Sequence, residues 1–182
     1  KFRYVAGHDM SLILAIDSGH SFIKWGIHDG IQWQAQNKVT IKDINTLQAQ
    51  WVNLSVKPTS IVISHVSNQF VRDKLSDLLS VWPISVHWVK SIPFQCGVFN
   101  GYSDPHQLGC DRWMALIAAK QNLFQQSCLV INVGTALTVD CLSDSGQFLG
   151  GIIFPGPYLM LRSLKENTEQ LGAEVGSYQD FP

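Results

Sequence analysis

The sequence predicts a duplicated α/β fold in which two similar halves face a shared cleft. An apolar strand that runs into a polar-x-Gly turn occurs at residues 14–21 and again at residues 129–136. A further turn with a glycine follows at a similar distance in both copies, at Gly30 and at Gly146. Short strand-length runs alternate with segments of helical period between these repeats. A repeated strand-turn-strand unit indicates a duplicated domain.

The first half opens with three strands. The apolar run 12–16 has strand length and ends at a D-x-G turn, and β-branched and aromatic residues resume at 22–27. Asp29-Gly30 is a hairpin signal before residues 31–35, which indicates that these strands are antiparallel. After them we expect a weak helix at 44–51, a buried strand at 60–64, a helix at 68–82 that Pro83 stops, and a strand at 85–89.

The second half follows a long irregular stretch. Residues 90–107 hold two prolines and two glycines and are the predicted junction between the halves. We therefore assign residues 10–105 to an N-terminal domain and residues 106–182 to a C-terminal domain. Within the latter we expect a helix at 109–123, a buried strand at 128–133, strands at 136–142 and 148–154, and a helix at 157–171 that begins with proline.

Composition narrows the class of partner. The chain has 182 residues, of which 46% are hydrophobic and 15% charged, as in an ordinary globular protein. Its 13 Lys and Arg against 14 Asp and Glu leave no positive field to attract nucleic acid or an anionic membrane. No apolar run approaches the roughly 20 residues that a membrane span needs. We expect a small-molecule or protein partner and no binding to nucleic acid or membrane.

The cysteines and the termini give further expectations. The 4 cysteines form no C-x-x-C pair and no zinc-type spacing, so we expect free thiols in a reducing cytoplasm. Residues 1–9 are polar and patternless, and we expect them to be foreign residues ahead of a native start at Met10. Residues 177–182 end on a turn signal, so we expect the second half to be incomplete.

The two glycine turns, residues 17–21 and 132–136, can bind phosphate. Glycine lets the backbone approach a ligand closely, and backbone N–H groups suit phosphate oxygens. Hydroxyls of Ser18, Ser21 and Thr135 add donors, Asp17 could hold magnesium through water, and Lys24 could reach back to a phosphate. For either turn alone the alternative is an ordinary tight turn with a solvated lysine, but the repetition favours phosphate binding.

A possible acid–base site follows the irregular stretch. Asp111 and Arg112 come after Gly109 at a predicted helix start, and Tyr102 lies just upstream. A carboxylate there can orient a hydroxyl and accept its proton, and a guanidinium can clamp a carboxylate. The alternative is a helix N-terminus with a favourable acid in its first turn and a solvated or paired arginine. No nucleophile elbow, Walker motif or dinucleotide fingerprint appears.

Four segments together resemble the type III pantothenate kinases, also described as Bvg accessory factors. D-S-G-H-S-F-I-K-W at 17–25 is similar to the first phosphate loop of that family, and G-C-D-R-W at 109–113 to its G-x-D-R-W signature. N-V-G-T-A-L-T-V-D at 132–140 resembles the second phosphate loop, and G-G-I-I-F-P-G at 150–156 the segment that follows it. The resemblance runs in order from about residue 12 to residue 171.

The resemblance implies a duplicated ribonuclease H-like, actin-like ATPase fold with mixed sheets flanked by helices, assembled as a homodimer. It implies transfer of the ATP γ-phosphoryl group to pantothenate, giving 4'-phosphopantothenate at the start of coenzyme A synthesis. It implies Asp111 as the base, Mg²⁺, and a monovalent cation, K⁺ or NH₄⁺, at the position of Asn132. The residues implied for ATP are Asp17, Ser18, Gly19, His20, Ser21, Phe22, Ile23, Lys24, Gly134 and Thr135, and those for pantothenate are Tyr102, Gly109, Cys110, Asp111 and Arg112.

Three departures from the family pattern bear on activity. Asn132 stands where the family has an acid, so its oxygen brings no negative charge to a cation. His20 replaces the usual asparagine of the first loop, and the chain ends before a threonine that contacts pantothenate in the family. The alternatives are a catalytically impaired nucleotide-binding regulatory or accessory protein of this fold, and a kinase for another hydroxylated metabolite.

Overall fold

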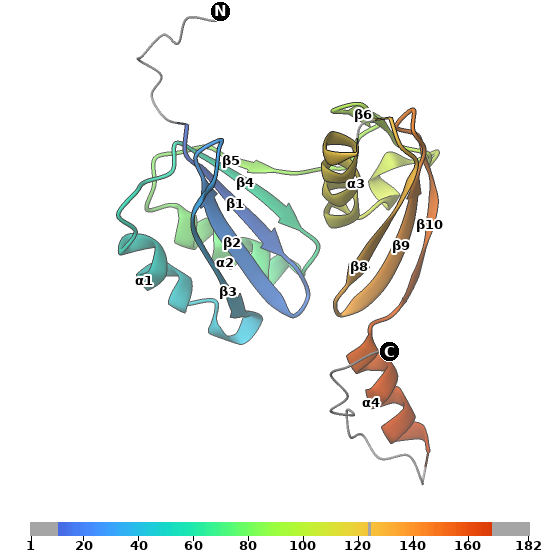
Figure 1. The fold of residues 1–182 in the computed structure, drawn as a ribbon. Coiled ribbons are helices and arrows are strands. Elements are labelled where there is room, and N and C mark those ends of the chain that lie inside the picture. Colours follow the sequence, from blue (N-terminus) through green and yellow to red (C-terminus); the bar gives the residue numbers. More distant parts are fainter. Residues whose placement is uncertain (1–10, 124, 169–182) are drawn as a thin grey trace, which may run out of the picture.

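The computed structural model describes residues 11–123 and 125–168 as two halves, each built on its own sheet (Figure 1). The expectations for residues 1–9 and Met10, for the last residues of the closing helix and for the end of the chain lie outside the described residues. None of the helices in the described part of the chain has the length and apolarity that crossing a membrane requires.

The first half is a five-stranded mixed sheet in the order β3-β2-β1-β4-β5. β1 is antiparallel to β2 and parallel to β4, and β5 is parallel to β4. The short helices η1 and α1 join β3 to β4, and α2 joins β4 to β5. The bounds are β1 Ile13–Ser18, β2 Phe22–His28, β3 Trp33–Thr40, η1 Ile41–Asp43, α1 Thr46–Val52, β4 Ser60–His65, α2 Gln69–Leu79 and β5 Val86–Trp88.

The third strand differs from the expectation of residues 31–35, because it begins at Trp33 and runs to Thr40. The reason is the turn before it, where the Asp29 carboxylate accepts the N–H groups of Ile31 and Gln32, each at 2.8 Å. Gly30 takes a φ of 93°, a left-handed conformation that favours glycine. The side-chain hydrogen bonds thus hold residues 31 and 32 in the turn.

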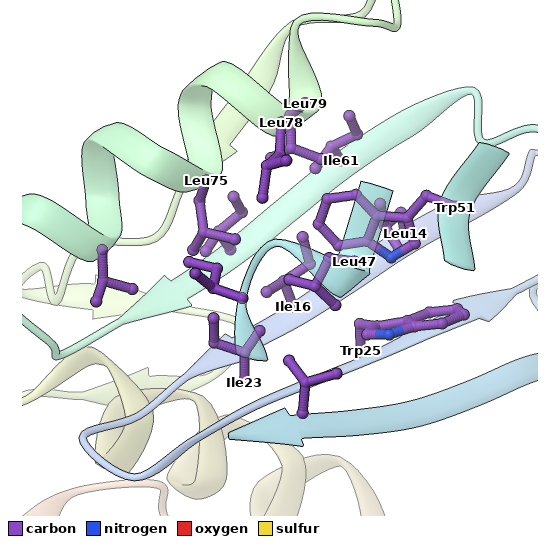
Figure 2. Packing of buried hydrophobic residues seen from close by; sticks show 14 of the residues in the cluster. Leu14, Ile16, Ile23, Trp25, Leu47, Trp51, Ile61, Leu75, Leu78 and Leu79 are labelled. Atoms are coloured by element: carbon purple, nitrogen blue, oxygen red, sulfur yellow. The ribbon is translucent and has the colours of Figure 1, made fainter. Parts of the chain in front are cut away.

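One face of the first sheet carries the larger core. Leu14 and Ile16 of β1 alternate toward α1 and α2, where they meet Trp51 and Leu75 (Figure 2). Asn68 caps α2 by accepting the N–H of Val71 at 3.0 Å. This packing fixes the positions of β1 and β4, whose carboxyl ends face the second half.

The second half is a three-stranded antiparallel sheet in the order β10-β9-β8, with α3 packed on one face. The expected strands and helices are present, with bounds α3 Cys110–Asn122, β8 Cys128–Val133, β9 Ala136–Leu142, β10 Phe148–Pro155 and α4 Pro157–Asn167. Its core includes Val98, which precedes the predicted domain boundary, and Trp113 and Phe148. The boundary between residues 105 and 106 stays a prediction.

The predicted irregular stretch, residues 90–107, contains regular structure. A small hairpin pairs β6 (Phe94–Gln95) with β7 (Val98–Phe99), and a short helix η2 (Pro105–Gln107) follows. Cys96 and Gly97 have φ angles of 50° and 80°, which closes the two-residue turn between the strands. Such short strands lie below the length that sequence periodicity can detect.

The strand register identifies equivalent positions in the two halves. Ile16 lies opposite Trp25 in the first sheet, as Ile131 lies opposite Val139 in the second. Ile16 is 3% exposed beneath α1 and α2, whereas Ile131 is 57% exposed on a face that no helix covers in the described residues. The fold class expected from the sequence, a duplicated α/β architecture of the actin-like type, is confirmed by this arrangement.

Candidate functional site

A cleft of about 690 Å³ lies where the two halves face each other. It is bordered by the first glycine turn, the second glycine turn and the first turn of α3. Twelve of the residues expected at a site line it. They are Asp17, Gly19, His20, Ser21, Phe22, Lys24, Gly109, Asp111, Arg112, Asn132, Gly134 and Thr135.

The two glycine turns meet directly in this cleft. The hydroxyl oxygens of Ser21 and Thr135, 114 positions apart in sequence, are 2.6 Å from each other in a hydrogen bond. Figure 1 shows the β1–β2 turn and the β8–β9 turn at the same end of the two sheets. Equivalent turns of the two repeats are therefore brought together, as the duplication predicts.

Some backbone N–H groups of these turns already donate hydrogen bonds within the protein, and others do not. The N–H of Gly19 donates to the carbonyl of Phe22 at 3.1 Å, and that of Gly134 donates to Ala136 at 3.0 Å. The N–H groups of His20, Ser21 and Thr135 have no acceptor within the described ranges. The glycines thus shape the turns, and the residues after them present the donors that suit an anion.

The second turn is closed by the start of α4. The N–H of Gly156 donates to the carbonyl of Thr135 at 2.9 Å. A Cβ at Gly156 would lie 2.6 Å from that oxygen and closer still to the carbonyl oxygen of Gly134. Only glycine fits this approach, which gives a physical reason for the glycine at the end of the G-G-I-I-F-P-G segment.

Asp17 and Lys24 face each other across β1 and β2. They are partners in the register, and Lys24 Nζ lies 3.3 Å from Asp17 Oδ2. About half of the Asp17 side chain is exposed, so its carboxylate is accessible from the cleft. Within the described ranges no group of three His, Cys, Asp or Glu residues is placed to hold a metal ion. A magnesium ion here would need ligands from water or phosphate besides Asp17.

Asp111 lies in the first turn of α3. Its Oδ1 accepts the backbone N–H of Arg112 at 2.8 Å, and a Cβ at Gly109 would lie 2.6 Å from the same oxygen. Glycine at the N-cap therefore makes room for the carboxylate to fold over the helix start. One carboxylate oxygen is held by the backbone, and Asp111 borders the cleft.

Arg112 forms a buried ion pair with Asp140 of β9. The Nε of Arg112 lies 3.1 Å from both carboxylate oxygens, and Nη2 also donates to Oδ1. Hydrogen bonding to Asp140 raises the pKa of Arg112, burial opposes the rise, and Tyr102 adds to it. A Cβ at Gly151 would lie 2.6 Å from Nη2, so the pair needs glycine at the facing position of β10.

Sequence reasoning missed Asp140 as a site residue. Thr138, Asp140 and Leu142 alternate on the buried side of β9, with Asp140 fully buried. A carboxylate at an inward strand position requires a buried partner. This alternation on β9 is the sequence signal that could have identified Asp140.

Four expected site residues lie outside the lining of the cleft. Ser18 and Ile23 are fully buried, and Tyr102 packs against Phe148 with ring centroids 5.3 Å apart. Cys110 is buried and is hydrogen bonded to Ser64 and His65. Their roles in ligand contact stay predictions.

Asn132 and His20 also border the cleft. Asn132 Nδ2 lies 3.4 Å from Thr138 Oγ1, and the amide oxygen has no partner within the described ranges. An amide oxygen can coordinate a cation but brings no negative charge, so a cation at Asn132 stays a prediction. His20 is exposed, so its ring adds bulk to the mouth of the cleft.

Comparison with known proteins gives a consistent result. The family model described as Type III pantothenate kinase matches residues 13–178. A type III pantothenate kinase of Nitrosospira multiformis is 47% identical over 171 residues, which are 94% of this chain and 64% of that protein. That of Nitrosomonas eutropha is 46% identical over 173 residues, covering 94% of this chain and 67% of its own.

Solved structures show the same fold at low identity. A conserved Baf family protein from Campylobacter jejuni has a TM-score of 0.52 at 20% identity, over 93% of this chain and 67% of that one. The ethanolamine utilization protein EutJ from Carboxydothermus hydrogenoformans has a TM-score of 0.50 at 10% identity, over 84% of this chain and 55% of that one. The chain thus spans 55% to 67% of the length of these four proteins.

Proposed function

We propose that this chain, which belongs to the type III pantothenate kinase family, transfers the γ-phosphoryl group of ATP to pantothenate in the cleft between its halves. The products are 4'-phosphopantothenate and ADP, at the start of coenzyme A synthesis. The observation that carries the proposal is the meeting of the two glycine turns at Ser21 and Thr135, with Asp111 bordering the same cleft.

The nucleotide side of the site is built from the two turns. The N–H groups of His20, Ser21 and Thr135 and the hydroxyls of Ser21 and Thr135 would bind the phosphate oxygens. Lys24 would add a positive charge once a phosphate competes with Asp17 for it. Asp17 fits Mg²⁺, which nucleotide sites bind through one or two carboxylates together with phosphates and which neutralises phosphate charge.

The acceptor side is built from the start of α3. Asp111 accepts the proton of the primary hydroxyl, the hydroxyl oxygen bonds to the γ-phosphorus, and the bond from that phosphorus to the bridging oxygen breaks to release ADP. Arg112 has five N–H donors, of which Asp140 engages the one on Nε and one on Nη2. The remaining donors would bind the carboxylate of pantothenate.

Alignment and charge neutralisation supply most of the acceleration in phosphoryl transfer. In this chain, a hydrogen bond between the turns sets the position of the donor phosphate, and a buried ion pair holds the acceptor-binding arginine. We further propose a monovalent cation at Asn132, a homodimer, and a cytoplasmic location. The four cysteines, all free thiols, are in keeping with that location.

The proposal is tested by ADP release in a coupled assay with pantothenate, with and without K⁺. We expect ADP formation that depends on pantothenate. Asp111→Asn should slow turnover by about 10²-fold or more while nucleotide binding is retained, since a positioned base contributes on that scale. No pantothenate-dependent ADP from the well-folded chain would contradict the kinase assignment, and unchanged turnover of the variant would remove Asp111 from the role of base.

A further inference from the structure

His65, at the end of β4, touches elements on both sides of the cleft without lining it. Its Nδ1 lies 3.0 Å from the hydroxyl of Ser18, which is fully buried and belongs to the first glycine turn. Its backbone N–H lies 3.2 Å from the sulfur of Cys110, and its carbonyl accepts from that thiol at 3.3 Å. Cys110 is the first residue of α3 and directly precedes Asp111.

We propose that His65 is a positioning residue that sets the separation between the first glycine turn and the start of α3. The proposal rests on the proposed function, since that separation aligns the γ-phosphate with Asp111. Main-chain contacts strengthen the link, because Ser18 and His65 are partners in the β1–β4 register and the N–H of Val66 donates to the carbonyl of Ser18 at 3.0 Å. The cysteine sulfur and one imidazole thus join three segments distant in sequence.

The surroundings of the ring favour its neutral form. Burial lowers the pKa of His65, and the positive charge of Arg72 lowers it further. Hydrogen bonding to the backbone of Asn68 acts in the opposite direction, and His20 contributes a small lowering. Ser18 of β1 and Trp88 of β5 contact the ring itself. Arg72 of α2 and His20 of the first turn act on the ring through their charges, and the Cys110 thiol of α3 contacts the backbone of His65.

Two contacts hold the ring in place. Nδ1 and the Ser18 hydroxyl form one hydrogen bond at 3.0 Å, and the tautomer of the ring decides which of the two donates. Trp88 packs against the ring edge to face, with centroids 5.6 Å apart, which restricts its rotation.

The first test needs no kinase activity. Nitrogen NMR of the full chain should show a His65 Nδ1 resonance that shifts in Ser18→Ala. Amide resonances of Gly19 and Asp111 should move in His65→Ala and return toward wild type in His65→Asn, whose amide can replace Nδ1 in the hydrogen bond to Ser18. An Nδ1 resonance that Ser18→Ala leaves unchanged, or amides that do not respond, would overturn the proposal.

The second test is kinetic. His65→Ala should lower kcat by about 10-fold or more, because small misplacements of reacting groups cost up to about 10²-fold. Nucleotide Kd should change by less than about threefold, since no ligand contact is lost. His65→Asn should recover most of kcat, and His87→Ala, an exposed histidine on the neighbouring strand β5, should match wild type.

Two further variants separate positioning from general loss of stability. Ser18→Ala combined with His65→Ala should be no slower than His65→Ala alone, as expected when two residues act through one contact. Cys110→Ser keeps a donor and an acceptor and should retain more kcat than Cys110→Ala. Additive losses, or an asparagine variant as slow as the alanine variant, would refute the link. An inactive wild-type chain would refute the proposed function, and the NMR test would still decide the role of His65.

Discussion

Asp140→Asn changes one oxygen to an NH₂ group, and the structure predicts that this small change causes a large loss of stability. Asp140 is fully buried, and its Arg112 partner has a side chain that is 7% exposed. The change keeps the size of the side chain but removes the negative charge, which leaves the guanidinium without a counter-charge. Removing one partner of a buried ion pair costs about 3–5 kcal/mol.

The expected magnitude is at the lower end of that range, about 3 kcal/mol, because Arg112 borders the cleft and water can reach part of it. For a chain of this size such a loss lowers Tm by roughly 6–12 °C. Urea unfolding at pH 7, followed by far-UV circular dichroism, measures the free energy of unfolding. Asp144→Asn is the matched control, since Asp144 is exposed on the turn after the same strand.

A second variant separates charge from packing. Arg112→Met in the Asp140→Asn background removes the unpaired charge and should recover part of the lost stability. A loss below about 1 kcal/mol for Asp140→Asn, equal to that of the control, would show that the carboxylate contributes little to this core. Failure of the double variant to recover any stability would assign the loss to packing.

Two other predictions concern stability. Ile16 and Ile131 occupy equivalent register positions, but Ile16 is 3% exposed and Ile131 57% exposed. Ile16→Ala should therefore lower the free energy of unfolding by about 2–5 kcal/mol, and Ile131→Ala by less than about 1 kcal/mol. Equal losses in urea unfolding would contradict the described packing. The lowered pKa of His65 means that the unfolded chain binds its proton more readily, so stability should be full above about pH 6.5 and fall as pH decreases from there toward the lowered value. Tm measured at several pH values should show a smaller decline for His65→Asn than for wild type, and identical declines would exclude His65 as a source.

Periodicity and turn signals predicted most of the fold. Apolar runs of strand length located β1 and β8, although β8 is mostly exposed and the expectation of a buried strand there was wrong. The repeated glycine turns placed the two phosphate-binding candidates together. The start of β3 was wrong because the hydrogen bonds of Asp29 extend the turn, which propensity does not register. The hairpin of β6 and β7 was missed because its strands have two residues each.

The sequence predicted the parts of the candidate site that depend on local backbone turns. It was less informative for residues whose role depends on side chains distant in sequence. Ser18 resembles a phosphate-binding hydroxyl, yet it follows Leu14 and Ile16 on the inward side of β1, so its side chain is buried. Strand alternation alone indicates this orientation. Asp140 and His65 depend on neighbours 28 and 47 positions away, and local spacing carries no record of such contacts.

A crystal structure of the chain with a non-hydrolysable ATP analogue and pantothenate tests the central claim most directly. The account predicts phosphate oxygens bonded to N–H or hydroxyl groups of both glycine turns, and the primary hydroxyl of pantothenate within about 3.2 Å of the Asp111 carboxylate. A nucleotide bound to one turn alone or outside the cleft, or a hydroxyl directed away from Asp111, would contradict it.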